Sequence, residues 1–176
     1  MSRPIDYFFT PQSPWAYLGH ARFVDLLRAS RRAVRVLPVD YGRIFPLSGG
    51  LPLGQRAPQR QAYRLAELRR FAAHLNIALH AEPRHFPVDG APAARLITAV
   101  AQADGPDAAL RLAGAVMAAC WAEQVVHHGQ LQQLADIGLI LYGRHFGDGL
   151  IQGLGERLQK VRPLNRASGT GGRRRE

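Results

Sequence analysis

The chain has 176 residues, of which 47% are apolar, and it carries a formal net charge of +10. This size and composition fit one globular domain, or one domain with an insertion, and exclude a disordered chain. No apolar run reaches the length of a membrane span and the first residues lack the pattern of a signal peptide, so we expect a cytoplasmic protein without a membrane partner.

The excess of positive charge raises the question of a nucleic-acid partner, but its distribution does not favour one. Residues 160–176 hold six basic side chains and one acidic one, which accounts for half of the net charge. Five more arginines lie in the segment from Arg56 to Arg70, both ends included, and most of them are interpreted as a solvated helix face. Of the 23 basic residues, 22 are arginine, a bias that a GC-rich genome produces as readily as a binding surface. We therefore predict no nucleic-acid partner.

The first predicted elements are a strand, a tight turn and a helix. The apolar run 5–9 predicts a short buried strand, which ends before a proline that cannot continue a ladder. Ser13 then predicts a helix N-cap, followed by Pro14 at the first helical position. Apolar side chains recur at helical spacing for about four turns: Tyr17, Ala21, Val24 and Leu27. Residues 33–39 predict a second strand, and a strand–helix–strand unit of this kind is parallel, as at the start of a thioredoxin-like fold.

The following segment, 41–58, is rich in glycine and proline and predicts a long loop. A helix is predicted from Pro58, with Glu67 placed to pair with Arg64 or Arg70. Its apolar face is predicted from four side chains: Leu65, Leu68, Ala72 and Leu75. After a connector over 76–88, two more helices are predicted to start near residues 89–92 and 104–107. Their expected inward side chains are Leu96, Val100 and Ala103 in the first, and Leu110, Met117 and Trp121 in the second.

The sequence around Ser13 allows two interpretations. A serine before a proline at a helix start is commonly only a cap. The same position also places a hydrogen-bonding side chain at the positive end of a helix, where a protein can hold a thiolate or another anion.

The segment from Tyr7 to Leu18 resembles a known family. Ser13-Pro14-Trp15-Ala16 stands where the DsbA oxidoreductases carry Cys-Pro-x-Cys, with serine for the first cysteine and alanine for the second. The pattern Ser-Pro-aromatic-small-aromatic-Leu resembles the kappa-class glutathione transferases and the 2-hydroxychromene-2-carboxylate isomerases. This resemblance implies an α/β, DsbA-like thioredoxin fold with an inserted helical domain. Because neither position can form a disulfide, a DsbA-like thiol oxidoreductase is excluded.

The resemblance also implies glutathione as cofactor. Ser13 would be catalytic and would bind glutathione, donating a hydrogen bond to its sulfur and favouring the thiolate. Arg60, with Arg56 as a second option, would hold a carboxylate of glutathione or of the substrate. Trp15 or Tyr17 would pack on an aromatic ring. The expected function is a glutathione-dependent isomerase that interconverts 2-hydroxychromene-2-carboxylate or a related aromatic pyruvate in aromatic-compound catabolism.

Other functions stay open beside this one: a kappa-like glutathione transferase, a basic polyanion-binding protein, and a truncated or frame-altered non-catalytic remnant of the family. The resemblance suggests a homodimer, and its expected partner is a small aromatic carboxylate substrate. We predict a thioredoxin-like first half over 1–57, an inserted helical domain over 58–124, a divergent part over 125–159 and a basic, disordered tail over 160–176.

The resemblance extends to about Gln124 and then stops. A thioredoxin-like fold needs a second half, entered through a cis-proline loop that faces the helix start. The only proline after Pro106 is Pro163, in the basic tail, so the second half of the core is not identified. We hypothesise that the C-terminal fifty or so residues are out of frame with the ancestral gene.

Neither redox nor metal chemistry is indicated by the remaining residues. Cys120 is the one cysteine, which excludes an internal disulfide, and its apolar surroundings predict a core position. Three histidines, at 127, 128 and 145, have no carboxylate or cysteine at ligand spacing, so no metal is expected.

Overall fold

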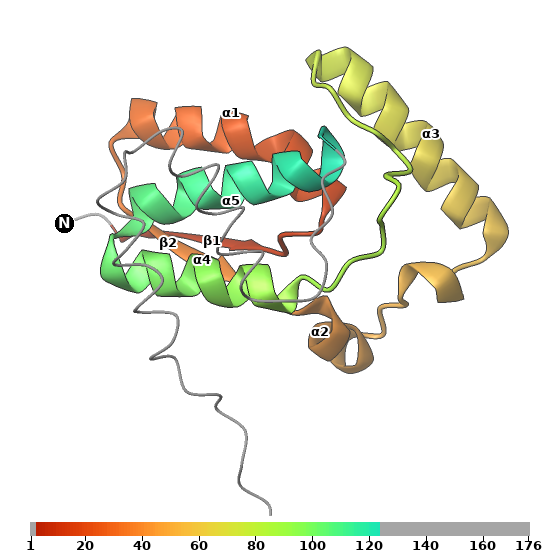
Figure 1. Ribbon diagram of the computed structural model, residues 1–176, viewed down its shortest axis with the longest axis horizontal. Coiled ribbons are helices and arrows are strands. Elements are labelled where there is room, and N and C mark those ends of the chain that lie inside the picture. The colour runs from red at the N-terminus through yellow and green to blue at the C-terminus, as the bar shows by residue number, and fades with distance from the viewer. Residues whose placement is uncertain (1–2, 124–176) are drawn as a thin grey trace, which may run out of the picture.

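The computed structural model describes residues 3–123 (Figure 1). The elements follow one another as β1 (Ile5–Phe9), α1 (Pro14–Ser30), β2 (Val34–Pro38), α2 (Tyr41–Ser48), a short 3-10 helix η1 (Leu53–Gln55), α3 (Pro58–Leu75), α4 (Ala91–Ala103) and α5 (Pro106–Trp121). The predicted strand–helix–strand start and the three later helices are therefore confirmed, with boundaries within a few residues of those expected.

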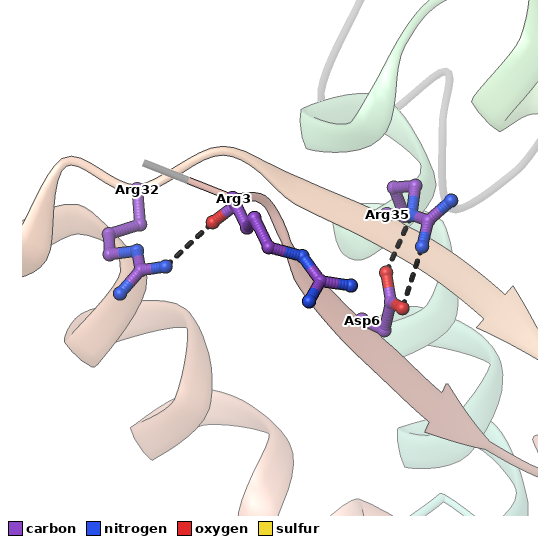
Figure 2. Close-up of polar contacts among 4 residues, drawn as sticks. All are labelled: Arg3, Asp6, Arg32 and Arg35. Carbon is purple, nitrogen blue, oxygen red and sulfur yellow. Dashed lines mark hydrogen bonds and ion pairs between the residues drawn. The ribbon is translucent and has the colours of Figure 1, made fainter. Parts of the chain in front are cut away.

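The two strands form a parallel pair whose register runs from Ile5 opposite Val34 to Phe9 opposite Pro38. Side chains alternate between the two faces of a strand. In β1 this places Phe9 in the core and leaves Phe8 62% exposed on the other face. On that outer face Asp6 lies opposite Arg35, and the guanidinium donates two hydrogen bonds to the carboxylate, at 2.6 and 2.7 Å (Figure 2). This bidentate bond lowers the pKa of Asp6.

The core lies between the strands and three helices. α1, α5 and α4 run side by side, with α5 in the middle (Figure 1). α5 is the most buried of them, since ten of its sixteen residues are buried, among them Met117 and Trp121 at 0% exposure. Small side chains such as Ala109 and Ala113 let α5 approach its neighbours closely, as the packing of ridges into grooves requires. The apolar core formed by these strands and helices holds β1, and with it the start of α1, in a fixed position.

α3 packs separately, against the first part of α1. A second apolar cluster is built from Leu18, Leu68 and Ala72, with the residues after α3 packed around it. The predicted apolar face of this helix is confirmed, because Leu68 and Ala72 are buried while Leu65 and Leu75 are partly buried. The connector that follows, over 76–88, contains a cis peptide bond between Phe86 and Pro87.

The prediction of one long loop over 41–58 is wrong, because the segment contains α2 and η1. Asp40 caps α2 by accepting a hydrogen bond from the Gly42 N–H at 2.8 Å, and Gly49 ends it in the left-handed conformation, at φ 73°. Pro46 lies inside this short helix, where it removes one backbone hydrogen bond. α2 has no buried residue, so its caps, rather than apolar periodicity, specify it.

Two details of the helix faces also differ from expectation. Ala21 and Ala103 are exposed, and the buried face of α1 instead includes Leu18 and His20. Glu67 forms no ion pair with Arg64 or Arg70 among the described residues; it accepts a hydrogen bond from Tyr63, which raises the pKa of that phenol. The proposed parts over 125–159 and 160–176, the three histidines and Pro163 lie outside the described residues.

Candidate functional site

The turn between β1 and α1 presents Ser13. The Ser13 N–H donates to the Thr10 carbonyl at 3.0 Å, which closes a four-residue turn with Pro11 at its second position. Proline is favoured at this position because its fixed φ matches the φ that the turn requires there. Phe9, at 2% exposure, anchors the preceding strand in the core, so the turn starts from a rigid point.

Ser13 is the N-cap of α1, as predicted. Its Oγ accepts a hydrogen bond from the Ala16 N–H at 3.3 Å, and Pro14 occupies the first turn of the helix. The first turn of this 17-residue helix carries no acidic side chain that would neutralise its positive end. Because Oγ acts as acceptor in the cap, its own proton remains able to donate to a second group, such as a sulfur anion.

The two aromatic candidates beside Ser13 differ in their availability. The Tyr17 hydroxyl donates to the Ala78 carbonyl at 2.9 Å, and burial raises the pKa of this phenol. Trp15 is 41% exposed and meets Phe71 of α3 edge to face, with ring centroids 5.6 Å apart. Trp15 therefore has a free ring surface for an aromatic ligand, whereas Tyr17 is used to attach the segment after α3.

The structure does not bring Arg60 into contact with Ser13. Arg60 is exposed in the first turn of α3, and it precedes Phe71 by eleven residues, about 16 Å along the helix axis. An extended ligand would be needed to bridge Ser13 and Arg60. Arg56, the second option, donates from Nε to the Leu51 carbonyl at 2.9 Å and lies 6.0 Å from the Phe45 ring, so it supports its own loop.

Arg64 is a residue that sequence reasoning missed. Its guanidinium lies 5.7 Å from the centre of the Phe86 ring and 6.0 Å from that of Trp121. Burial lowers its pKa, with Arg56 as a further cause. Cation–π contacts of this kind attach α3 to the connector and to the end of α5. The signal was present in the spacing, because Arg64 precedes the buried Leu68 by one helical turn and so shares its face.

His20 is a second residue that sequence reasoning missed. It is buried, its Nδ1 lies 3.0 Å from the Tyr7 hydroxyl, and its Nε2 lies 3.0 Å from the Leu110 carbonyl oxygen. Because a carbonyl can only accept, Nε2 carries the proton and Nδ1 accepts from Tyr7. Burial lowers the pKa of His20 and raises that of Tyr7 to about 12. The sequence feature that indicates the buried position of His20 is its spacing of seven residues from Leu27, which places both side chains on the same face of α1.

Two cavities lie near these elements, and Ser13 lines neither of them. One is a groove of about 820 Å³ between α1 and α5, with Val24, Leu27 and Leu110 among its lining residues. The other has a volume of about 20 Å³ and lies beside Gln12. Within residues 3–123 no three potential metal ligands cluster together. No helix in the described part of the chain is long and apolar enough to cross a membrane.

Comparisons with known proteins agree with this architecture. The DSBA-like thioredoxin domain family matches residues 4–137, three quarters of the chain, and this match ends 13 residues past Gln124. No curated protein matches the sequence at a significant level.

Two solved structures are similar to the chain. One is a 2-hydroxychromene-2-carboxylate isomerase, with a TM-score of 0.57, 20% identity, and coverage of 90% of this chain and 76% of that one. The other is the cytosolic disulfide reductase DsbM from Pseudomonas aeruginosa, with a TM-score of 0.57, 18% identity, and coverage of 90% and 74%. At these identities the structures show the fold, which is the DsbA-like thioredoxin fold. The family match covers most of the chain, and the chain belongs to the DSBA-like thioredoxin domain family.

Proposed function

We propose that this chain is a glutathione-dependent isomerase acting on 2-hydroxychromene-2-carboxylate or a related aromatic pyruvate. The observation that carries the proposal is the position of Ser13, a hydroxyl on the N-cap of α1 whose proton is not used in the cap. Serine at 13 and alanine at 16 exclude disulfide chemistry by the chain itself, so the DsbM-like alternative lacks its reacting groups. The isomerase among the structural neighbours supports the proposed class.

The residues beside Ser13 fit a thiolate. Its hydroxyl can donate to the sulfur, and the first-turn positions of α1 carry no carboxylate to repel the charge. A hydrogen bond to the ionised form and a helix N-terminus both lower the pKa of a thiol, here that of glutathione. Bound glutathione supplies a nucleophilic sulfur that adds to the conjugated side chain of the substrate and leaves again.

The remaining roles belong to side chains at the edge of this site. The exposed ring of Trp15 would pack on the aromatic substrate. Arg60 would hold a carboxylate at the far end of an extended ligand, since it lies about three helical turns along α3 from the contact with Trp15. The cytosolic location named for DsbM supports a cytoplasmic location for this chain too.

The test compares Ser13→Ala with Ser13→Thr. Both side chains occupy the turn, but only threonine keeps the hydroxyl and the cap. We expect Ser13→Ala to raise the pKa of bound glutathione, followed by the thiolate absorbance, and to lower kcat for isomerisation by about 100-fold, as loss of a donor to a reacting anion does. Ser13→Thr should keep most of the isomerase activity, and the pKa of bound glutathione should stay close to its wild-type value.

Three outcomes separate the alternatives. An unchanged rate in Ser13→Ala would remove Ser13 from the mechanism. Conjugation of an electrophilic aromatic halide without isomerisation would indicate a kappa-like glutathione transferase. A wild-type protein that neither binds to immobilised glutathione nor gains thermal stability from it would be a non-catalytic member of the family, because a ligand that binds the native state raises its stability.

A further inference from the structure

Gln12, the residue before Ser13, has a buried oxygen without a partner. Its Oε1 is shielded from solvent, yet it accepts no hydrogen bond from any residue between 3 and 123. Such an atom normally has a protein or water partner, because leaving it unpaired costs free energy.

The Gln12 side chain reaches the N-terminus of α4. Gly90 is the N-cap of that helix, and it offers no side chain to cap it. Its backbone, at φ −83° and ψ −7°, is open to any residue. However, a Cβ atom on Gly90 would overlap Oε1 of Gln12 and lie 2.7 Å from its Cδ. The amide of Gln12 therefore fills the space beside the first turn of α4 that a side chain at position 90 would take.

The first turn of α4 has a matching unpaired donor. The Ala91 N–H donates to the Asp89 carboxylate at 2.9 Å, and the Ala94 N–H donates to the Gly90 carbonyl at 2.9 Å. Of the two residues between Ala91 and Ala94, Pro92 has no N–H. The other, Ala93, is buried, and its N–H donates no hydrogen bond to another described residue. In helices, this third N–H is one that an N-cap oxygen accepts from.

The residues that carry the two unpaired groups both line a small cavity. It has a volume of about 20 Å³ and is lined by Gln12, Gly90, Ala93 and Cys120, among others. This volume holds one water molecule, which needs two to four polar partners. The residues that line the cavity carry three such groups: the Ala93 N–H, the Gln12 oxygen and the Cys120 thiol.

We propose that Gln12 caps α4 through one buried water and thereby holds the Ser13 turn in place. The water accepts from the Ala93 N–H and donates to Oε1 of Gln12. The turn from Thr10 to Ser13 is then fixed both by its own backbone bond and by α4, which makes Gln12 a positioning residue for Ser13. The consequence for thiolate formation rests on the proposed function, while the cap does not.

The first test uses the wild-type protein and nuclear magnetic resonance. A buried water bound to the Ala93 N–H should give a magnetisation-transfer signal between the water and that amide, and absence of this signal overturns the proposal. The second test is Gln12→Met, which keeps the size of the side chain and removes the acceptor. Hydrogen exchange of the Ala93 and Ser13 amides should become about fivefold faster. Unchanged exchange at both would show that Gln12 only fills space.

A double variant separates capping from positioning. Gln12→Ala makes room for Gly90→Ser, which places a hydroxyl beside the first turn of α4, near the position of the lost amide oxygen, without any link to the Ser13 turn. We expect this pair to restore slow exchange at Ala93 but not at Ser13; restoration at both would overturn the positioning role. Gly90→Ser alone should be less stable than the pair, because the new side chain meets Gln12.

The catalytic readout is the pKa of bound glutathione. Gln12→Met should raise it, and the double variant should not return it to the wild-type value. A merely structural loss of stability would leave the pKa of the bound thiol unchanged. If the wild-type chain binds no glutathione, the proposed function fails, while the water signal and the two exchange rates still decide the role of Gln12.

Discussion

Replacing His20 with leucine removes two hydrogen bonds from the core at once. In the native chain the Tyr7 hydroxyl donates to Nδ1 and Nε2 donates to the Leu110 carbonyl, each at 3.0 Å. Each bond contributes about 1 kcal/mol net, and the Tyr7 hydroxyl left without an acceptor costs about 1 kcal/mol more. We therefore expect His20→Leu to lower the free energy of unfolding by about 3 kcal/mol, measured by urea denaturation at pH 7.5.

The same variant should change how stability depends on pH. Burial lowers the pKa of His20 below its ordinary value of 6.5, against an opposing effect of the Leu110 bond. The unfolded chain therefore takes up the proton more readily, and stability is lost as the pH falls through 6.5. Between pH 7.5 and 5.5 this loss is at most about 1.4 kcal/mol. The free energy of unfolding of His20→Leu should lack this pH-dependent loss.

Two further variants test whether His20 is the group that titrates and whether its two hydrogen bonds contribute to stability. Tyr7→Phe keeps the histidine but removes one bond, so it should keep the pH dependence. Tyr7→Phe combined with His20→Leu replaces both partners by apolar groups, and it should cost less than the sum of the single changes. If wild type and His20→Leu lose the same stability between pH 7.5 and 5.5, His20 is not the group that titrates.

The other predictions concern the second cluster, a backbone position and the cysteine. Leu68→Ala should lower the free energy of unfolding by about 2–5 kcal/mol, since Leu68 is fully buried, while Leu47→Ala, at 89% exposure, should change it by less than about 0.5 kcal/mol; urea denaturation measures both. Gly49→Ala should cost about 1 kcal/mol because of its φ of 73°, whereas Gly54→Ala, with open space and no positive φ, should be nearly neutral in the same assay. Cys120 should react slowly with a thiol reagent at pH 7.5 and rapidly in urea, because burial raises its pKa to about 11; fast labelling of the folded chain would contradict its core position.

The elements that could be predicted from the sequence are those with apolar periodicity and strong ends. β1 ends before a proline and α1 begins at Ser13-Pro14, so both were predicted within a residue or two. The helix α2 has no buried side chain, and therefore no periodic pattern marks it. Its capping by Asp40 and Gly49 was the available signal, but glycine and proline on either side resembled a loop.

Of the candidate site, the N-cap position of Ser13 is the part that the sequence predicts and the structure confirms. Ser13 is recognisable because an N-cap followed by proline specifies both its backbone and its surroundings. Gln12, Arg64 and His20 depend on partners from 13 to 90 residues away, such as Tyr7 and Leu110 for His20. No local pattern specifies such contacts, although a polar residue at the spacing of a buried apolar one marks the candidates. The proposed link between Arg60 and Ser13 depended on how α3 lies on α1, which local spacing does not give.

In the glutathione site that we propose around Ser13, thiolate formation and affinity for the ligand depend on different residues. Thiolate stabilisation depends on the Ser13 hydroxyl, the start of α1 and the turn that holds them, and each of these lies among the described residues. In the same proposal, affinity for the peptide part of glutathione depends on groups further away, including Arg60 and the segment that faces the turn. A chain with a preserved turn and an altered facing segment would therefore bind glutathione weakly yet still lower the pKa of the thiol it binds. Measured together at saturating glutathione, the dissociation constant and the thiol pKa distinguish this case from loss of the turn itself, because disruption of the turn would return the pKa toward that of free thiol.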